Sequence, residues 1–334
     1  MLSVILPVHN ASAYLARALS NLQASVGIDD EVIVVDDHST DDSLALVRAW
    51  GGQIAGRLIV LENDARGVAS ARNLAVSHAK GDFIWFADCD DDWSPQILAR
   101  MSEVAVATGA DIVICNAEKI TQPSGSRAVI EDATVSEVLN GKQSLLRLLR
   151  GDIEGHLWNK LFRRTLFAES PFPATRAHSD LGGMFALLAS ADLIAAVPEV
   201  LYTYYVHEGS VLNRKQYRWD DLWDCLALAR AHVGTGTDDR RALITFTYRN
   251  VIVPTVNESV RRESVSERAD IERARRRAKK AVRISDLLEL VRLGQRDAAV
   301  RGLLIKFVFP IYRALYKRHR AKRWGELDAF ASSR

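Results

Sequence analysis

The sequence has little cysteine and no long apolar run. Three cysteines in 334 residues are too few and too scattered for a disulfide framework or a zinc ribbon, and they fit a reducing cytoplasm. No stretch reaches the roughly 18–20 apolar residues that span a bilayer, because the best one, residues 303–316, is interrupted by two basic residues and a proline. Residues 1–8 lack the basic start of a signal peptide. We therefore expect a cytoplasmic protein without a transmembrane helix.

Glycine-rich phosphate loops are also absent. No Gly-x-Gly-x-x-Gly follows the first apolar run, and no Gly-x-x-x-x-Gly-Lys-Ser/Thr occurs anywhere. A dinucleotide-dependent dehydrogenase, a P-loop phosphotransferase and a nucleotidyltransferase would each lack their phosphate cradle. A nucleotide bound through a divalent metal and acidic loops remains.

The net charge is only +2, but it hides an uneven distribution. Residues 1–260 carry 23 basic and 33 acidic side chains, whereas residues 261–334 carry 21 basic and 9 acidic ones. Such asymmetry suggests an anionic partner for the basic end of the chain.

Short runs of Val, Ile and Leu alternate with stretches of helical spacing in the first half. The expected strands are residues 3–8, 31–35, 57–61, 83–86 and 111–115, and the expected helices are residues 13–22, 42–50, 69–79 and 96–108. This alternation predicts an α/β fold with a mostly parallel sheet covered by helices on both faces. From about residue 219 the pattern is almost entirely helical, with a break at 234–237 and a charged helix near 264–283.

Polar residues follow three of the expected strands, where an open parallel sheet binds its ligands. They are His9, Asn10, Asp36, Asp37 and the acidic cluster Asp88, Asp90, Asp91 and Asp92. Four carboxylates within five residues repel one another unless a cation or a hydrogen-bond network compensates them, and oxygen ligands suit Mg²⁺ or Mn²⁺. The alternative is a solvated turn in which Asp92 or Ser94 caps a helix.

Six segments of the chain resemble family 2 glycosyltransferases of the GT-A fold. They are Ser-Val-Ile-Leu-Pro-Val-His-Asn at 3–10, Val-Val-Asp-Asp-His-Ser-Thr-Asp-Asp-Ser at 34–43, Gly-Val-Ala-Ser-Ala-Arg-Asn at 67–73, Gly-Asp-Phe-Ile-Trp-Phe-Ala-Asp-Cys-Asp-Asp at 81–91, Trp-Asn-Lys-Leu-Phe-Arg at 158–163 and Tyr-Thr-Tyr-Tyr-Val-His-Glu-Gly-Ser at 202–210. They occur in the family's order, and the resemblance stops before the C-terminal helices.

The resemblance implies a nucleotide-sugar donor and assigns roles on the donor side. His9 would lie against the nucleobase and Asp37 would accept the uracil N–H, a sensible contact between a carboxylate and an imide donor. Asp36 is either a ligand or an acceptor that orients the loop, and Arg72 is either a donor contact or a helix-surface arginine. The nucleotide-binding set implied is Pro7, His9, Asn10, Asp36, Asp37, Arg72 and Asp88.

The resemblance also implies a divalent metal, Mn²⁺ or Mg²⁺, held by Asp90 and His207. A lone histidine is more often structural, so the role of His207 rests on its place in the last of the six segments. The residues expected on the diphosphate or acceptor side are Asp91, Trp158, Lys160, His178, Ser210 and Arg214.

Asp180 matches the position of the family's general base, which deprotonates the acceptor hydroxyl. The family's preceding Glu is Ser179 here, so we expect His178 to take its place on a different acceptor. Capping of the helix at 181–189 is the structural alternative for Asp180, and the two roles are compatible. A core tryptophan is the alternative for Trp158.

The basic end contains two dense cationic runs, residues 273–280 and 317–323, and the second follows an apolar, aromatic stretch at 303–312. Apolar residues beside a cationic face suggest an interfacial helix on an anionic membrane surface. The alternatives are a solvated face packed on the protein and a helix that forms a homo-oligomer. No nucleic-acid-binding module is recognisable, so nucleic acid is not an expected partner.

The sequence therefore predicts a catalytic GT-A domain at residues 1–215 and a basic, mainly α-helical region at 216–334. The expected activity is inverting, metal-dependent transfer of a hexosyl or N-acetylhexosaminyl group from a nucleotide sugar, most plausibly a UDP-sugar, to a cell-surface glycan such as a capsule or cell-wall polysaccharide, or to a lipid-linked acceptor. The protein would be cytoplasmic or peripheral on the cytoplasmic face of the membrane. The alternatives are a polyprenyl-phosphate glycosyltransferase and a non-catalytic glycan-binding scaffold.

Overall fold

The structure is a computed structural model that describes residues 1–121, 124–130, 138–168, 170–175, 177–206, 218–264 and 267–331, with side chains described up to residue 320. The chain divides into two compact units. The first comprises Met1–Leu148 and Asp152–His207, and the second comprises Leu149–Gly151 and Glu208–Arg334.

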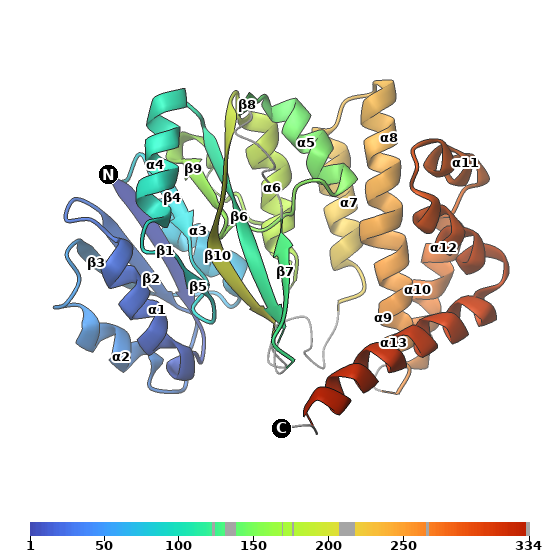
Figure 1. Cartoon of the computed structure of the whole chain (residues 1–334), viewed down its shortest axis with the longest axis horizontal. Coiled ribbons are helices and arrows are strands. Elements are labelled where there is room, and N and C mark those ends of the chain that lie inside the picture. The colour runs from blue at the N-terminus through green and yellow to red at the C-terminus, as the bar shows by residue number, and fades with distance from the viewer. Residues whose placement is uncertain are drawn as a thin grey trace. The chain divides into compact units, whose positions relative to one another are not determined.

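The first unit is built on one ten-stranded sheet whose main path runs β3-β2-β1-β4-β9-β6-β10-β5 (Figure 1). β7 pairs with β6, and β8 pairs with β10. The strands are β1 (Leu2–Val8), β2 (Glu31–Asp36), β3 (Arg57–Glu62), β4 (Phe83–Phe86), β5 (Asp92–Trp93), β6 (Ile112–Thr121), β7 (Ser126–Ile130), β8 (Val138–Leu139), β9 (Lys160–Arg163) and β10 (Ile194–Val206).

The central strands are parallel and buried on both faces. β1 pairs in parallel with β2 on one side and with β4 on the other, and β6 pairs in parallel with β10. All six residues of β2 and all four of β4 are buried, which explains why these strands read as continuous apolar runs. The predicted α/β fold with a mostly parallel central sheet is confirmed. The antiparallel β9, inserted between β4 and β6, was not expected.

Helices cover both faces of this sheet. Trp85 of β4 joins a core with apolar residues of α1, α2 and α4. Its neighbour Phe86, which points to the other face, packs edge-on against Phe172, and Phe172 in turn contacts α3 and α6 through Asn73 and Gly183. The helices are α1 (Ser12–Ser25), α2 (Ser43–Trp50), α3 (Val68–His78), α4 (Ile97–Thr108), α5 (Gly141–Arg150) and α6 (Ser179–Ser190), with the short 3₁₀ turn η1 (Arg164–Leu166).

The second unit is helical throughout its described residues. Its elements are α7 (Asp221–His232), α8 (Thr237–Phe246), the π-helical segment η3 (Thr247–Ile252), α9 (Val253–Arg261), α10 (Arg268–Ala281), α11 (Ile284–Arg292), α12 (Arg296–Phe307) and α13 (Phe309–Ala331). The break predicted at 234–237 separates α7 from α8. One apolar core joins residues from α8 to α13, including Tyr248, Leu290 and Tyr312.

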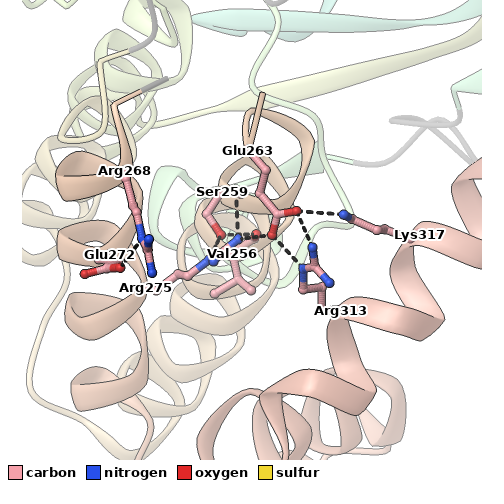
Figure 2. A network of polar contacts seen from close by, with 8 residues as sticks. All are labelled: Val256, Ser259, Glu263, Arg268, Glu272, Arg275, Arg313 and Lys317. Atoms are coloured by element: carbon pink, nitrogen blue, oxygen red, sulfur yellow. Dashed lines mark hydrogen bonds and ion pairs between the residues drawn. The ribbon is translucent and has the colours of Figure 1, made fainter. Parts of the chain in front are cut away.

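A carboxylate just after α9 ties three basic side chains together. Glu263 accepts hydrogen bonds from Arg275 of α10 at 2.6 Å and from Arg313 and Lys317 of α13 at 2.7 Å (Figure 2). Part of each cationic run is therefore engaged within the unit. No helix in the described part of the chain is long and apolar enough to cross a membrane.

Candidate functional site

The candidate site lies at the carboxyl ends of β1, β2 and β4. β1 is the central strand of the three, and the chain moves from it to β2 on one side and later to β4 on the other, so the strand order reverses here. Such a reversal is where open α/β sheets bind ligands. Pro7 lies beyond the last β1–β4 pair, Ile5 with Phe86, so the N–H that proline lacks is not needed by that ladder.

The loops after β1 and β2 hold each other in shape. The side-chain oxygen of Asn10 accepts the Thr40 N–H at 2.7 Å, and Asp36 accepts the Ser39 N–H at 3.2 Å through one carboxylate oxygen. The other oxygen of Asp36 is buried and has no hydrogen-bond partner among the described residues. Asn10 and His38 have positive φ angles, 50° and 60°, which is uncommon outside glycine and concentrates at functional loops.

Asp37 directly follows β2, and its carboxylate has a defined orientation. Its carboxylate accepts the Asn63 side-chain amide at 2.8 Å and the Gly67 N–H at 3.0 Å. Gly67 has a φ of 109°, a conformation that side chains rarely adopt, so glycine is needed for this contact. His9 lies beside it, with Nδ1 2.6 Å from the Asp37 carbonyl oxygen. The structure thus brings together the two residues expected to recognise a nucleobase.

Asp88 follows β4 and carries a perturbed charge. Burial is the main cause that raises its pKa, Asp90 and Asp180 add to the shift, and Arg72 opposes it, so that the pKa lies at about 6. The Arg72 guanidinium lies 3.4 Å from the Asp88 carboxylate and is itself buried, with its Nε unpartnered among the described residues. Arg72 is therefore a buried partner of the acidic loop and not a helix-surface arginine.

Asp91 anchors the loop after β4 to β10. It is fully buried, and its two oxygens accept the Tyr202 hydroxyl at 2.9 Å and the Tyr205 N–H at 2.8 Å. Because both oxygens are engaged by β10, this geometry does not suit direct contact with a diphosphate or an acceptor. Asp92 begins β5 and accepts the side-chain amide of Asn21 of α1, so it does not cap α4.

Asp180 lies in the first turn of α6. One carboxylate oxygen accepts the N–H of Leu181 at 2.8 Å, and the other lies 4.0 Å from Nδ1 of His156. The carboxylate is about one-third exposed. His178 precedes the helix with a positive φ of 62°. A carboxylate at a helix start, held by the backbone but still accessible, is well placed to act as a base, and local bonding is compatible with that role.

Trp158 belongs to a stack of aromatic rings inside the first unit. Its ring stacks on His156 at 4.6 Å and on Tyr202 at 4.4 Å between centroids. Since Trp158 is only 4% exposed, it does not present a face to a sugar ring. It connects His156, beside Asp180, to Tyr202, which binds Asp91.

Lys160, like Asp91 and Trp158, is buried within the unit and does not face the expected substrate side. It is fully buried, and its ammonium donates to the carbonyl oxygens of Glu154 and His156 and to the side chain of Asn159, at 2.7–2.9 Å. Its role is to hold the loop that carries His156. His207, Ser210 and Arg214 lie outside the described residues.

The remaining acids fit a divalent cation with few protein ligands. Both oxygens of Asp91 are engaged, whereas the Asp88 carboxylate is partly exposed beside Arg72 and has a pKa raised mainly by burial and also by Asp90 and Asp180. Within the described ranges no group of three or more His, Cys, Asp or Glu is arranged to hold a metal. Mg²⁺ characteristically takes one or two carboxylates and completes its shell with water and substrate phosphates.

Donor-side acids and the candidate base share one site. Burial, together with the charges of Asp91, Asp88, Asp90 and Asp180, raises the pKa of Tyr204 to about 12. Carboxylates from the loop after β4 and from α6, which lie far apart in the sequence, thus both affect the pKa of this one tyrosine.

Two residues at this site were missed by sequence reasoning. Asn63, which orients Asp37, directly follows β3, so the strand-end rule used for the other loops could have found it. His156 precedes Trp158 by two residues, but nothing in the spacing indicated that the loop returns to Asp180.

Comparison with known proteins agrees with this geometry. The sequence matches the model of glycosyl transferase family 2 over residues 3–170, which is half of the chain. This chain belongs to that family. It is similar to the EpsH protein of Bacillus subtilis, with 26% identity over 219 residues that cover 64% of this chain and 63% of EpsH. The matched stretch thus spans less than two thirds of that relative.

Solved structures share the fold. The Staphylococcus aureus TarS fragment 1–349, crystallised with UDP-GlcNAc, superposes with a TM-score of 0.72 at 19% identity and covers 96% of this chain and 92% of that one. The mannosyltransferase PcManGT of Pyrobaculum calidifontis, crystallised with GDP-Man and Mn²⁺, gives a TM-score of 0.55 at 18% identity and covers 94% and 86%.

Proposed function

We propose that this chain is an inverting glycosyltransferase that moves a sugar from a UDP-sugar to a hydroxyl of a cell-surface glycan or a lipid-linked acceptor, with Mn²⁺ or Mg²⁺. The observation that carries the proposal is the shared site: Asp180 of α6 is close enough to raise the pKa of Asp88, the acid that follows β4. This proximity supports a donor site and a base that act on the same pair of substrates. Membership of glycosyl transferase family 2 supports the same reaction class.

The nucleotide end is bound by the β1 and β2 loops. Asp37, oriented by Asn63 and Gly67, accepts the imide N–H of uracil, and the flat imidazole of His9 packs against the base. Because the carboxylate is fixed before the donor arrives, little conformational entropy is lost on binding. The TarS fragment was crystallised with UDP-GlcNAc, which agrees with a UDP donor.

The diphosphate end lies near Asp88, Asp90 and Arg72. Asp88 and Asp90 are the residues that would hold the divalent cation, and PcManGT was crystallised with Mn²⁺. A bound cation supplies positive charge that stabilises the departing nucleoside diphosphate. Arg72 orients the Asp88 carboxylate from 3.4 Å and keeps it available at neutral pH by opposing the effect of burial.

Asp180 is the candidate base for the acceptor hydroxyl. It belongs to α6, whereas the donor loops follow β1, β2 and β4. In an inverting transfer the base acts on the face of the sugar opposite the leaving nucleotide. The bond from the Leu181 N–H fixes one oxygen and leaves the other toward His156. General-base catalysis of this kind typically contributes about 10²–10⁴-fold in rate.

The proposal is tested by the thermal midpoint of the full chain with a panel of nucleotide sugars, each with and without Mn²⁺. A specific donor at about 100 times its dissociation constant stabilises the folded state by about 2.7 kcal/mol. We expect a UDP-sugar with Mn²⁺ to raise the midpoint most. If only GDP-sugars raise the midpoint, the donor nucleotide is GDP and not UDP. If no nucleotide sugar raises it, the proposal is contradicted.

A further inference from the structure

The last three helices of the second unit each expose an apolar row. The rows are Ile284, Leu288 and Val291 on α11, Val300, Leu303 and Phe307 on α12, and Ile311 and Leu315 on α13 together with Val308, which directly precedes that helix. These nine side chains are 37–59% exposed. Spacings of three and four residues place each set on one side of its helix. We call these nine residues the apolar stripe.

The stripe lies apart from the core of its own unit. On the same helices Leu287 and Leu290, Ala298 and Ile305, and Tyr312 are buried in the common helical core. The three helices follow one another in sequence and pack together in the described structure (Figure 1). Single exposed leucines are ordinary, but exposed apolar rows on three successive helices, of which α12 packs against both α11 and α13, are more than scattered exposure explains.

Cationic side chains accompany the stripe. Arg296 stands four residues before Val300, and Arg318 three residues after Leu315, so each continues an apolar row, and both are exposed. No described ion pair involves either of them. Two acids of these helices are engaged in ion pairs: Glu289 pairs with Arg241 and Arg292, and Asp297 of α12 pairs with Arg301. Asp286 of α11 accepts a hydrogen bond from the Ser285 hydroxyl.

Other basic residues of α13 face elsewhere. Arg313 and Lys317 point back to Glu263, which also holds Arg275 (Figure 2). This network fixes the rotation of α13 within the unit. Its remaining side carries Ile311, Leu315 and Arg318, so the helix presents apolar and cationic groups together.

We infer that the apolar stripe of α11–α13, with Arg296 and Arg318, docks on an anionic lipid bilayer surface. An apolar row enters the boundary between head groups and acyl chains while arginines at its ends reach the lipid phosphates. We favour a lipid surface over a second copy of the chain, because the arginines that continue the apolar rows match the anionic phosphates of lipid head groups. Since the stripe lies outside the family match at residues 3–170, this inference does not depend on the transferase reaction.

Sedimentation of the full chain with vesicles tests the inference. The vesicles are phosphatidylcholine alone, or phosphatidylcholine mixed with phosphatidylglycerol, each at low and high salt. We expect binding to the anionic vesicles that weakens with salt, because surface charge is screened. Wild-type protein that stays in the supernatant with anionic vesicles would overturn the inference.

Variants separate the apolar and the charged contributions. Leu303→Ser with Phe307→Ser is expected to lower the partition coefficient at least about tenfold, whereas the control Ile28→Ser with Val106→Ser, at exposed positions of the first unit, leaves it unchanged. Arg296→Glu with Arg318→Glu is expected to lower it at least about 25-fold, at roughly fivefold for each arginine lost. Arg230→Glu with Arg240→Glu makes the same charge change on α7 and α8 as a control.

Two further outcomes would reject the inference. One is equal vesicle binding by wild type and the Leu303→Ser, Phe307→Ser variant. The other is a wild-type dimer in light scattering that this variant converts to monomer, without vesicle binding by either protein, which would assign the stripe to a second copy. The substituted side chains are exposed, so unchanged thermal midpoints are the expected check on folding.

Discussion

The two units treat negative charge in opposite ways. In the first, Asp88 lies close to Asp90 and Asp180, and burial together with these charges raises its pKa to about 6 despite Arg72. In the second, Glu263 is surrounded by Arg313, Lys317 and Arg275, which hold its pKa well below its usual value. A scaffold neutralises its charges internally, whereas a site that must take up a charged ligand leaves part of its charge to be compensated by that ligand.

This difference fixes the sign of each unit's pH dependence. Asp88 binds its proton more tightly in the folded than in the unfolded chain, so its contribution to stability is present at acid pH and is lost as pH rises from 3.8 through about 6. Glu263 is the reverse, because its folded pKa is lowered. Its contribution is present above 4.5 and is lost as pH falls toward the folded value.

The largest effect is expected at the candidate base. Asp180→Asn removes the proton acceptor but keeps the oxygen that receives the Leu181 N–H, so turnover should fall by about 10²–10⁴-fold while a nucleotide sugar still raises the thermal midpoint. Steady-state release of nucleoside diphosphate measures the rate. Asp192→Asn, just beyond the other end of α6, is the matched control. A rate within a few fold of wild type would remove Asp180 from the mechanism.

Donor affinity is the next test of the first unit. Asp37→Ala removes a charged acceptor, a change worth roughly 1.5–3 kcal/mol, so we expect the dissociation constant for the nucleotide sugar to rise about 10–100-fold. Titration calorimetry measures it, with Asp64→Ala in the neighbouring exposed loop as the control. Unchanged affinity in the Asp37 variant would place the nucleobase elsewhere.

His156 should have a smaller effect that separates positioning from packing. His156→Phe keeps an aromatic ring on Trp158 but removes the nitrogen 4.0 Å from Asp180. We expect kcat to fall about tenfold, with KM for the donor unchanged, because the base loses orientation and the donor pocket does not. The exposed His232→Phe is the control. An equal loss in kcat and donor affinity would indicate that His156 only supports the fold.

Stability measurements give the smallest effects and test the charge comparison itself. In ligand-free, metal-free protein at pH 8, Asp88→Asn should raise the free energy of unfolding by on the order of 1 kcal/mol, after allowing for screening at this partly exposed side chain. Glu263→Gln should lower it by about 1 kcal/mol, a loss that disappears as pH falls below the ordinary glutamate range.

Denaturant unfolding at several pH values measures both changes. If Asp88→Asn destabilises the protein at pH 8 as Glu263→Gln does, the acidic loop is a structural network like that of the second unit, and the contrast between the units is wrong.

Much of the fold followed from apolar periodicity. Short buried runs such as residues 31–35 and 83–86 are typical of parallel strands when helices separate them along the chain. β9 did not follow, because it has only four residues, begins with a lysine and pairs antiparallel between two strands distant in sequence. Local pattern carries no information on such long-range pairing.

The sequence predicts which site residues lie at strand ends. It does not predict which hydrogen-bond partners their side chains have. Asp37 and Asp88 lie where parallel strands end, as sequence spacing indicates. Asp91 and Lys160 also lie in segments that match the family. However, Asp91 is engaged by the Tyr205 N–H and Lys160 by loop carbonyl oxygens, and only the tertiary structure brings these partners near. Spacing places a residue in a loop, and packing decides whether it faces a ligand.

The most direct test of the account is release of UDP from UDP-sugars by the full chain, before and after metal removal. We predict release with at least one UDP-sugar in the presence of Mn²⁺ or Mg²⁺, loss of release when the metal is chelated, and recovery when metal is added in excess. Absence of release with every nucleotide sugar tried, or equal release with and without chelator, would contradict the claim that the uncompensated carboxylates of the first unit bind a metal and a nucleotide sugar.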